Sequence, residues 1–386
     1  MMSHKSKQEL AAALRPRYQR TSWAAKRQIL DEFVAITGYH RKYAIQLLKH
    51  WPRLRRPQRQ PSPRKYTAAV VTALEQVWRA ANSICGKRLV AVLPALVEAL
   101  ERHGEVHLDS ETRRLLLDIS PATADRLLRP ARQRLGRRRG VSTTKPGTLL
   151  KHAIAIRTFA DWDDAQPGFV EVDLVAHCGD SPAGEFVHSL DLVDVVTRWS
   201  ECIALPNRSQ AAVKAALISV RGQLPFPLRG LDSDNGAEFI NATLLRYCEQ
   251  EQITFTRARP HKKNDQAYVE QKNWSNVRQL VGYDRYEGQT ACETLNRLYA
   301  TWRLYSNFFQ PVMVLLSKER DGAKVKKHYD QPKTPYQRVL DSAAVTEADK
   351  ARLRQLYPTL NPAALLRQIK TQQAAVWQLA QKAAAA

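Results

Sequence analysis

The segment Phe169-Val-Glu-Val-Asp173 decides how the middle of this chain folds. Its apolar residues are an aromatic ring and two β-branched valines, a composition that favours a buried strand. The apolar character continues to Ala176, so we expect a strand over residues 169–176. The carboxylate of Asp173 ends the most apolar part of this strand.

The sequence on the carboxyl side of this strand alternates between short apolar runs and longer helical patterns. We expect further strands over residues 185–193, 197–205, 228–232 and 253–256. Helical spacing of apolar residues, ended by Gly222 in the first case, predicts helices over 209–221, 238–250 and 265–281. The resulting order βββαβαβα predicts an α/β layer fold with a mixed sheet.

Two further acids accompany Asp173 in this region. Asp234 follows a short expected strand in the run Leu231-Asp-Ser-Asp-Asn-Gly-Ala-Glu-Phe239, and Glu270 follows after 35 intervening residues. If the first and fourth strands are neighbours, Asp173 and Asp234 lie roughly 5 Å apart. Two carboxylates that close raise one another's pKa, and a divalent cation reverses this effect. Oxygen ligands alone favour Mg²⁺ or Mn²⁺.

A pair of such ions about 4 Å apart is an arrangement that serves phosphoryl transfer. We therefore expect Asp173, Asp234 and Glu270 to be the catalytic residues and the metal ligands, with two Mg²⁺ (or Mn²⁺) ions per active site. Each acid also has an ordinary interpretation. Asp-Asn-Gly is a common turn sequence, Asp173 could bond within the sheet, and Asp232 or Glu171 could be mistaken for the ligands. The coincidence of three acids with this order of elements favours the site.

Charge points to the partner of this chain. The 386 residues carry 60 Lys and Arg against 37 Asp and Glu, a formal net charge of +23. Such a positive field is typical of proteins that bind a polyanion. The five cysteines are scattered with no CxxC pair, which indicates reduced thiols of a cytoplasmic protein and not a zinc site. A polar N-terminus and the lack of long apolar stretches predict no membrane partner.

The N-terminal half contains two candidate DNA-binding domains. In residues 1–50, helices are expected at 23–36 and 40–48 around Thr37-Gly38, with Arg41 and Lys42 opening the second helix. This is the helix-turn-helix pattern, although any helical hairpin can resemble it. In residues 67–135, Ser120 and Pro121 begin a helix on which Thr123, Arg126 and Arg129 share a face. An ordinary helical bundle is the alternative for this second domain.

Basic segments separate these regions. A Pro/Arg-rich linker is expected at residues 51–66 and a basic linker and connector at 136–167; the alternative is a soluble spacer. The core then spans residues 168–288, and a mostly helical C-terminal region with a small basic element spans 289–386. Candidate DNA contacts outside the helices are Arg53, Arg55, Arg56, Arg137, Arg138 and Arg139, together with His261, Lys262 and Lys263 in the loop before Glu270.

From Gly168 to Val281 the chain resembles the integrase catalytic core shared by retroviral integrases and bacterial insertion-sequence transposases. The run Ser233-Asp-Asn-Gly-Ala-Glu-Phe239 is similar to the second-aspartate motif, and the spacing to Glu270 matches that family. Two features depart from the retroviral pattern. Val277 stands seven residues after Glu270, where Lys or Arg is often found, with Arg278 next. The zinc-binding His/His/Cys/Cys domain has no counterpart.

The resemblance implies a multidomain α + α/β protein: N-terminal helix-turn-helix domains, an RNase H-like mixed sheet flanked by helices, and a mostly helical C-terminal region. It implies a DDE transposase that cuts 3′ ends and joins them to target DNA. Its partners would be double-stranded DNA, as terminal inverted repeats and target, and a second copy of the chain in a dimer or higher oligomer. A nuclease of the same fold and a non-catalytic DNA-binding regulator are the alternatives.

Overall fold

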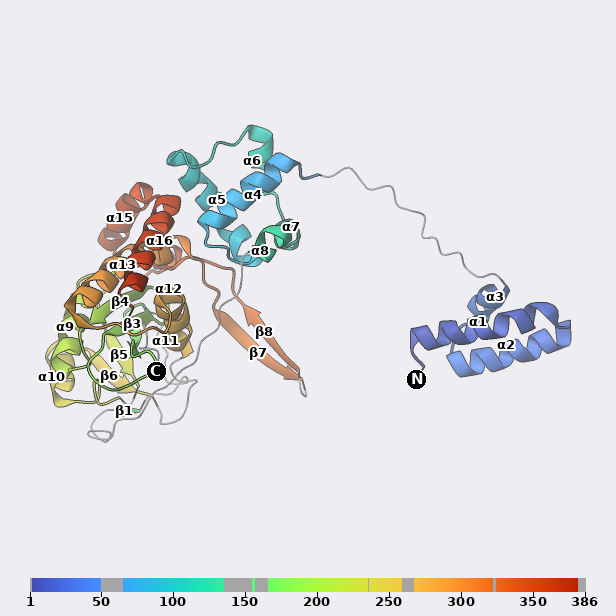
Figure 1. Cartoon of the computed structure of the whole chain (residues 1–386), viewed down its shortest axis with the longest axis horizontal. Helices are drawn as coiled ribbons and strands as arrows, with labels where there is room; N and C mark the ends of the chain where they lie inside the picture. The colour runs from blue at the N-terminus through green and yellow to red at the C-terminus, as the bar shows by residue number, and fades with distance from the viewer. Residues whose placement is uncertain are drawn as a thin grey trace. The chain divides into compact units, whose positions relative to one another are not determined.

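The structure is a computed structural model that describes residues 2–49, 65–134, 155–156, 166–234, 236–258, 267–321 and 324–380. The chain divides into two compact units, Met1–Lys65 and Tyr66–Ala386 (Figure 1). Each unit has its own core and is described by itself. In the described part of the chain, no helix combines the length and apolar character needed to cross a bilayer.

The first unit consists of three helices, α1 (His4–Arg20), α2 (Trp23–Thr37) and α3 (Arg41–Lys49). The side-chain oxygen of Ser22 accepts from the backbone N–H of Ala25 and begins α2, as expected. Gly38 ends α2 at a positive φ of 67°, and its N–H donates to the carbonyl oxygen of Val34. The sequence did not lead us to expect α1, which packs on the other two helices. The shared core consists of Ala11, Tyr18, Ile29, Leu30, Phe33, Ala44, Leu47 and Leu48.

The second unit begins with a helical bundle of α4 (Ala68–Ala80), α5 (Gly86–Arg102), α6 (Ser110–Leu117), α7 (Pro121–Leu127) and α8 (Arg129–Gln133). Ser120 begins α7, accepting from the N–H of Thr123, and Pro121 is the first helical residue, both as expected. Leu128 is fully buried, whereas Leu127, also expected in the core, is only half-buried. α7 is a short helix, so its side chains cover less of the core than a longer helix would.

The sheet has six strands in the order β1-β6-β5-β2-β3-β4. They are β1 (Ala155–Ile156), β2 (Phe169–Ala176), β3 (His188–Asp194), β4 (Ser200–Leu205), β5 (Gly230–Ser233) and β6 (Thr254–Arg257). β2, β3 and β4 pair antiparallel, and β2, β5, β6 and β1 pair parallel. The expected mixed sheet is therefore confirmed. β2 occupies its centre, next to β5.

Helices cover both faces of the sheet (Figure 1). α9 (Gln210–Arg221) and α10 (Ala242–Gln250) lie on one side. The other side carries α11 (Ala267–Lys272), which continues as a π-helix, η2 (Asn273–Arg278), and then α12 (Gln279–Val281). The long helix α13 (Gly288–Phe309) also lies on this second side, where the Tyr299 hydroxyl bonds to the Ser189 hydroxyl of β3 at 2.7 Å.

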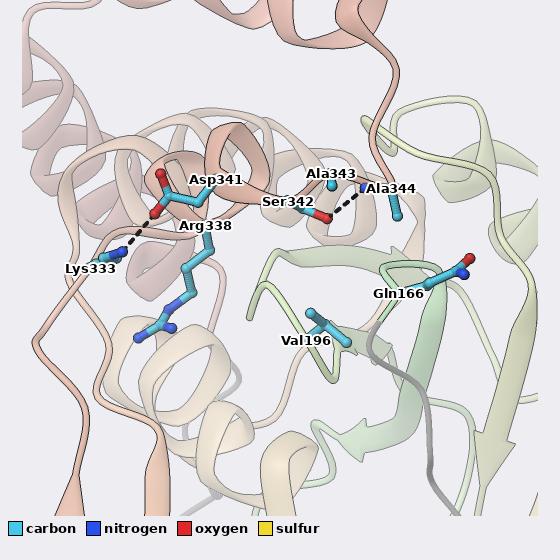
Figure 2. Close-up of a pocket in the computed structure, with 8 residues that line it drawn as sticks. All are labelled: Gln166, Val196, Lys333, Arg338, Asp341, Ser342, Ala343 and Ala344. Carbon is cyan, nitrogen blue, oxygen red and sulfur yellow. Dashed lines mark hydrogen bonds and ion pairs between the residues drawn. The ribbon is translucent and has the colours of Figure 1, made fainter.

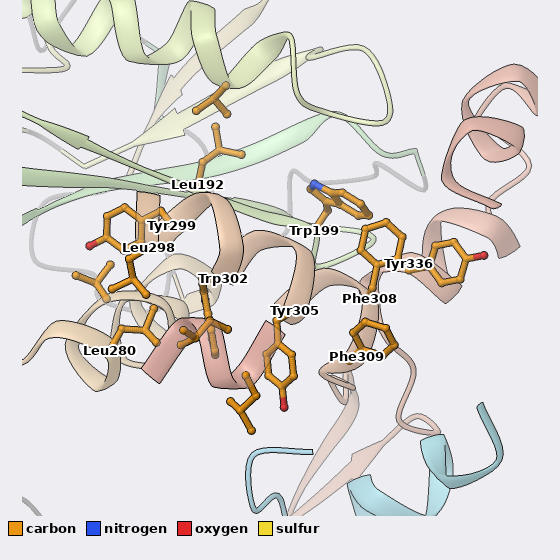
Figure 3. Packing of buried hydrophobic residues seen from close by; sticks show 14 of the residues in the cluster. Leu192, Trp199, Leu280, Leu298, Tyr299, Trp302, Tyr305, Phe308, Phe309 and Tyr336 are labelled. Carbon is orange, nitrogen blue, oxygen red and sulfur yellow. The ribbon is translucent and has the colours of Figure 1, made fainter. Parts of the chain in front are cut away.

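The C-terminal region adds a hairpin and helices. The hairpin consists of β7 (Leu315–Asp321) and β8 (Lys324–Tyr329), where the small basic element was expected. α14 (Pro335–Asp341), α15 (Glu347–Leu356), the 3₁₀ turn η3 (Tyr357–Thr359) and α16 (Pro362–Gln378) follow. Aromatic rings join these helices to α13: Phe308 stands between Trp199 and Tyr336, with ring centroids 5.7 and 5.0 Å away (Figure 3).

Specific bonds fasten the helical bundle to the rest of the second unit. The Tyr305 hydroxyl of α13 donates to the carbonyl oxygen of Ala80 at 2.7 Å, and Arg88 donates to the carbonyl oxygen of Pro311 at 2.6 Å. Arg367 of α16 forms an ion pair with Glu105 at 2.6 Å. Bundle, sheet and C-terminal helices thus share one core, and the domain boundaries expected inside this unit stay predictions.

Candidate active site

Asp173 and Asp234 follow adjacent positions of two parallel strands. The register pairs Val172 of β2 with Ser233 of β5, so each acid is the next residue along its strand. Burial, together with the negative charge of Asp234, raises the pKa of Asp173 to about 7. Burial also raises the pKa of Asp234. The sheet thus brings the two carboxylates close enough to repel one another.

The turn after β5 fixes the Asp234 carboxylate. The backbone N–H of Gly236 donates to Oδ1 of Asp234 at 2.8 Å. A Cβ at position 236 would lie 2.9 Å from that oxygen and 2.7 Å from the carboxyl carbon of Glu238. A side chain at position 236 would therefore displace the carboxylate of Asp234 or Glu238 from its position. Asp234 therefore fits both interpretations of the Asp-Asn-Gly sequence. It belongs to a turn, and that turn orients its carboxylate as a candidate metal ligand.

Asp173 is held by two donors. The N–H of Leu174 reaches Oδ1 at 2.8 Å, and the side-chain amide of Asn273 reaches Oδ2 at 2.6 Å. The other polar side-chain atom of Asn273, Oδ1, is buried and has no hydrogen-bond partner among the residues that the structure describes. A buried acceptor without a donor is costly, and a cation is one group that removes this cost.

Glu270 lies on the first turn of α11, three residues before Asn273, and it is exposed. Among the residues that the structure describes, no three His, Cys, Asp or Glu side chains form a cluster that could hold a metal ion. The structure therefore brings Asp173 and Asp234 together and keeps Glu270 on the adjacent helix, outside their cluster.

The side-chain oxygens of Asp173, Asp234 and Asn273 fit a hard divalent cation. Carboxylate and amide oxygens, with no sulfur or imidazole, are the ligands that Mg²⁺ and Mn²⁺ prefer. The raised pKa of both acids means that their ionised pair needs added positive charge. Asp173, Asp234 and the Oδ1 atom of Asn273 are therefore the atoms that suit such an ion.

Neighbouring acids have structural partners. Glu171 and Asp232, which the sequence offered as rival ligands, are paired across β2 and β5 and are both 2% exposed. Asp232 accepts from the Thr256 hydroxyl at 2.6 Å. On β3, Asp191 accepts from the side-chain amide of Asn276 at 3.1 Å and lies opposite Asp173. We call Glu171, Asp173, Asp191 and Asp232 the acid face, since their register places them on one side of the sheet.

The π-helix explains the departure at position 277. Val277 is fully buried, so it makes no contact with a phosphate. A π-helix bonds residue i to i+5, one residue further than an α-helix, so Arg278 stands one wide turn beyond Asn273. Arg278 donates to the carbonyl oxygen of Ala176 on β2 at 3.1 Å. The wide turn thus places a guanidinium, and not Val277, beside the strand that carries Asp173.

The candidate DNA contacts are placed as follows. Lys42 is exposed, whereas Arg41 forms an ion pair with Asp31 of α2. Arg126 and Arg129 are exposed, and Arg126 donates to the hydroxyl of Thr123 at 3.3 Å. The remaining candidates lie outside the described residues: Arg53, Arg55, Arg56, Arg137, Arg138, Arg139, His261, Lys262 and Lys263.

A separate surface hollow of about 670 Å³ lies between the turn after β3 and α14 (Figure 2). Val196, Arg338 and an ion pair between Lys333 and Asp341 line it. None of the acid-face residues reaches this hollow. The hollow and the candidate catalytic acids therefore lie in different places. Asp173 and Asp234 are the better guide to a functional site, because their pKa values are raised.

Sequence reasoning missed Asn273, Asn276 and Arg278 as partners of the acids. One signal was present: Asn273 follows Glu270 by three residues, a spacing that places both on one helix face, and an amide beside a candidate ligand is a natural donor to it. The π-helix had no such signal, because its geometry follows from tertiary contacts.

Known proteins resemble this chain in part or over most of its length. Residues 163–263 match the family model described as Integrase core domain. A protein of Sinorhizobium fredii (strain NBRC 101917 / NGR234), named "Uncharacterized protein y4rM", is 44% identical over 343 residues, which cover 87% of this chain and 96% of that protein. The catalytic core domain of BIV integrase is similar at 19% identity with a TM-score of 0.31, covering 45% of this chain and 95% of that one.

Proposed function

Because this chain belongs to the integrase-like DDE transposase family, we propose that it cuts and joins DNA as the transposase of an insertion sequence. In this proposal it binds the terminal inverted repeats of the element, cleaves their 3′ ends and transfers them into target DNA. Asp173, Asp234 and Glu270 are its catalytic residues. Integrase core domains are polynucleotidyl transferases, and the net charge of +23 suits a DNA substrate.

One observation carries the proposal: Asp173, in the middle of β2, and Asp234, directly after the end of β5, follow paired residues of neighbouring parallel strands, inside the matched segment 163–263. Burial, together with the adjacent Asp234 charge, raises the pKa of Asp173 to about 7. Strained acid pairs of this kind are typical of functional sites. Their repulsion is relieved by Mg²⁺ or Mn²⁺.

Two successive phosphoryl transfers make up the reaction. In the first, a water oxygen bonds to phosphorus at the element end, and the bond from phosphorus to the 3′ oxygen breaks. In the second, the freed 3′-hydroxyl oxygen bonds to a target phosphorus, and the target's own 3′ oxygen leaves. When bound, two divalent cations supply positive charge for the attacking and leaving oxygens.

The chain's own residues prepare these steps. Asn273 and Leu174 hold the Asp173 carboxylate through its two oxygens, and Gly236 orients Asp234. Glu270 stands three residues before Asn273, which at 1.5 Å rise per residue is about 5 Å along the helix axis. A change of its side-chain rotamer, with DNA and cation bound, would bring its carboxylate toward the pair.

The test incubates purified full-length protein with labelled element-end DNA, supercoiled target DNA and Mg²⁺. Joined products are the expected result. Nicked ends without joining would favour a nuclease of the same fold, and bound but unchanged DNA would favour a regulator. Asp180→Asn, at an exposed acid of the loop after β2, is the matched control for Asp173→Asn.

A further inference from the structure

Buried Glu171 is bonded to the helix that carries Glu270. Its Oε2 atom accepts from the backbone N–H groups of Tyr268 and Val269, both at 2.9 Å. These are N–H groups of the first turn of α11, which have no partner inside their own helix. Glu270 is the next residue in the chain after Val269. The start of α11 is therefore tied to the strand that carries Asp173.

This bond is one of three along the helix. Glu171 holds the first turn, Asp173 is held by Asn273 at 2.6 Å, and the Ala176 carbonyl accepts from Arg278 at 3.1 Å. The three strand residues are successive points along β2, so the helix runs beside that strand. Glu270 lies between the first and second attachments, and only the Glu171 attachment precedes it.

A buried cation supports the same attachment. The guanidinium of Arg198 lies 3.5 Å from the centroid of the Tyr268 ring, and Arg198 is 5% exposed. Its backbone has a φ of 65°, a left-handed conformation that side chains rarely adopt. Strain of this kind persists where the surroundings require the residue's position. Arg198 therefore covers the first turn of α11.

We propose that Glu171 is a positioning residue, which fixes the first turn of α11 and so sets where Glu270 stands relative to Asp173 and Asp234. The role is indirect: Glu171 acts through two backbone N–H groups and is itself too buried to meet DNA. This inference rests on the proposed function for its kinetic consequence. Its structural consequence, an ordered first turn of α11, does not depend on that function.

Three substitutions separate positioning from bulk stability. Glu171→Gln keeps a carbonyl oxygen of the same reach and should still accept both N–H groups. Glu171→Asp keeps the charge but is shorter by one methylene, and Glu171→Ala removes the acceptor. Glu201→Gln is the matched control, because Glu201 is an equally buried carboxylate of the same sheet, bonded instead to Arg303 at 2.6 Å and to Trp199.

Hydrogen exchange of the backbone amides is the first measurement. In the full chain without DNA, the Tyr268 and Val269 amides should exchange at least about tenfold faster in Glu171→Ala and Glu171→Asp than in wild type. In Glu171→Gln they should stay close to wild type. Glu201→Gln should lower thermal stability without selective acceleration at these amides. Unchanged exchange in both the Ala and Asp variants would overturn the proposal.

Single-turnover cleavage of element-end DNA is the second measurement. Misplacing a catalytic group by about 1 Å costs on the order of 100-fold, so we expect that loss in Glu171→Ala and Glu171→Asp, with DNA affinity unchanged. Glu171→Gln should retain activity within about tenfold of wild type. Equal loss in the Gln and Ala variants would contradict positioning, since the charge itself would then be required. If wild-type protein neither cuts nor joins, the proposed function fails while the exchange result still decides the role of Glu171.

Discussion

The acid face of the sheet and the exposed basic residues of the helical regions differ in the surroundings of their charged groups. On the acid face each carboxylate is buried or half-buried and meets fixed donors, such as Asn273 for Asp173 and Asn276 for Asp191. On the helices, Lys42 and Arg126 are exposed and stand on surfaces that a long polyanion could follow. Buried charges are costly and specific in position, whereas exposed ones act mainly through their number. Substitutions in the two regions should therefore differ in the size of their effect and in the activity that they change.

The largest effect is expected on the acid face. Asp173→Asn keeps the shape of the side chain but removes the charge that a cation needs, so cutting and joining should both fall by at least about 1,000-fold. Binding to element-end DNA should stay within about twofold, since the basic helices are untouched. Gel-shift and strand-transfer assays on one preparation check both. Substantial joining by Asp173→Asn would remove this residue from the mechanism.

The next effect is expected on the basic helices. Arg126→Ala should weaken binding to element ends by about 1–3 kcal/mol, and binding to random duplex by less, if Arg126 reads base edges. Arg114→Ala is the matched control, because this exposed arginine of α6 is already paired with Glu111 at 2.7 Å. Fluorescence anisotropy with both DNAs measures the difference. An equal loss on both duplexes would make Arg126 a phosphate contact.

A smaller effect concerns pH. Burial, helped by Asp234, raises the folded-state pKa of Asp173 to about 7, above its ordinary value, so the folded protein holds this proton more tightly than the unfolded chain. Its contribution to stability is therefore present at low pH and is lost as pH rises through 7. Between pH 6.5 and 8 the metal-free wild type should lose roughly 1 kcal/mol more than Asp173→Asn. Thermal unfolding of both proteins, with Mg²⁺ removed by chelation, measures this difference.

Buried histidines affect the pH dependence of stability at lower pH. Burial lowers the pKa of His177 to about 3 and that of His188 to about 4, so each must gain a proton when the chain unfolds in acid. The contribution of these two histidines to stability should therefore fall below about pH 6.5 in wild type and in Asp173→Asn alike. A pH profile identical in the two proteins above pH 6.5 would contradict the raised pKa of Asp173.

The smallest effect is expected at a single exposed lysine. Lys42→Ala should weaken binding to all duplexes about equally and lower the slope of log affinity against log salt by roughly one unit. Arg41→Ala should have less effect, because Arg41 is already paired with Asp31. Titrations at several salt concentrations distinguish the two. A preference of the Lys42→Ala loss for one sequence would assign that residue to base recognition.

The same contrast explains what the sequence could predict. The strand at Phe169–Ala176 was predicted with its observed bounds because a run of buried β-branched residues is a local signal. The proximity of Asp173 and Asp234 was expected only on the condition that the first and fourth strands are neighbours, and β2 does pair with β5. The helix α1 was missed because Pro16 and many charged residues obscure its pattern. α14 was missed although Thr334, Pro335 and Gln337 form a capping box, a signal that could have revealed it.

The features that the sequence did not predict depend on contacts between segments far apart in the chain. Nothing in the local sequence at Glu171 indicates that its carboxylate accepts N–H groups from residues almost a hundred positions later. The π-helix, which places Arg278 and not Val277 beside β2, likewise depends on tertiary contacts. For the basic residues, exposure follows from the structure, but which of them touch DNA stays a prediction.

The central claim is that Asp173, Asp234 and Glu270 together hold divalent cations beside a DNA phosphate. Anomalous diffraction from crystals of the protein bound to element-end DNA and Mn²⁺ tests it most directly. The account predicts manganese between Asp173 of β2 and Asp234, which follows the end of β5, contacted by oxygens of both acids, with the Glu270 carboxylate turned into the same cluster. Manganese bound elsewhere, or Glu270 still directed to solvent in that complex, would contradict it.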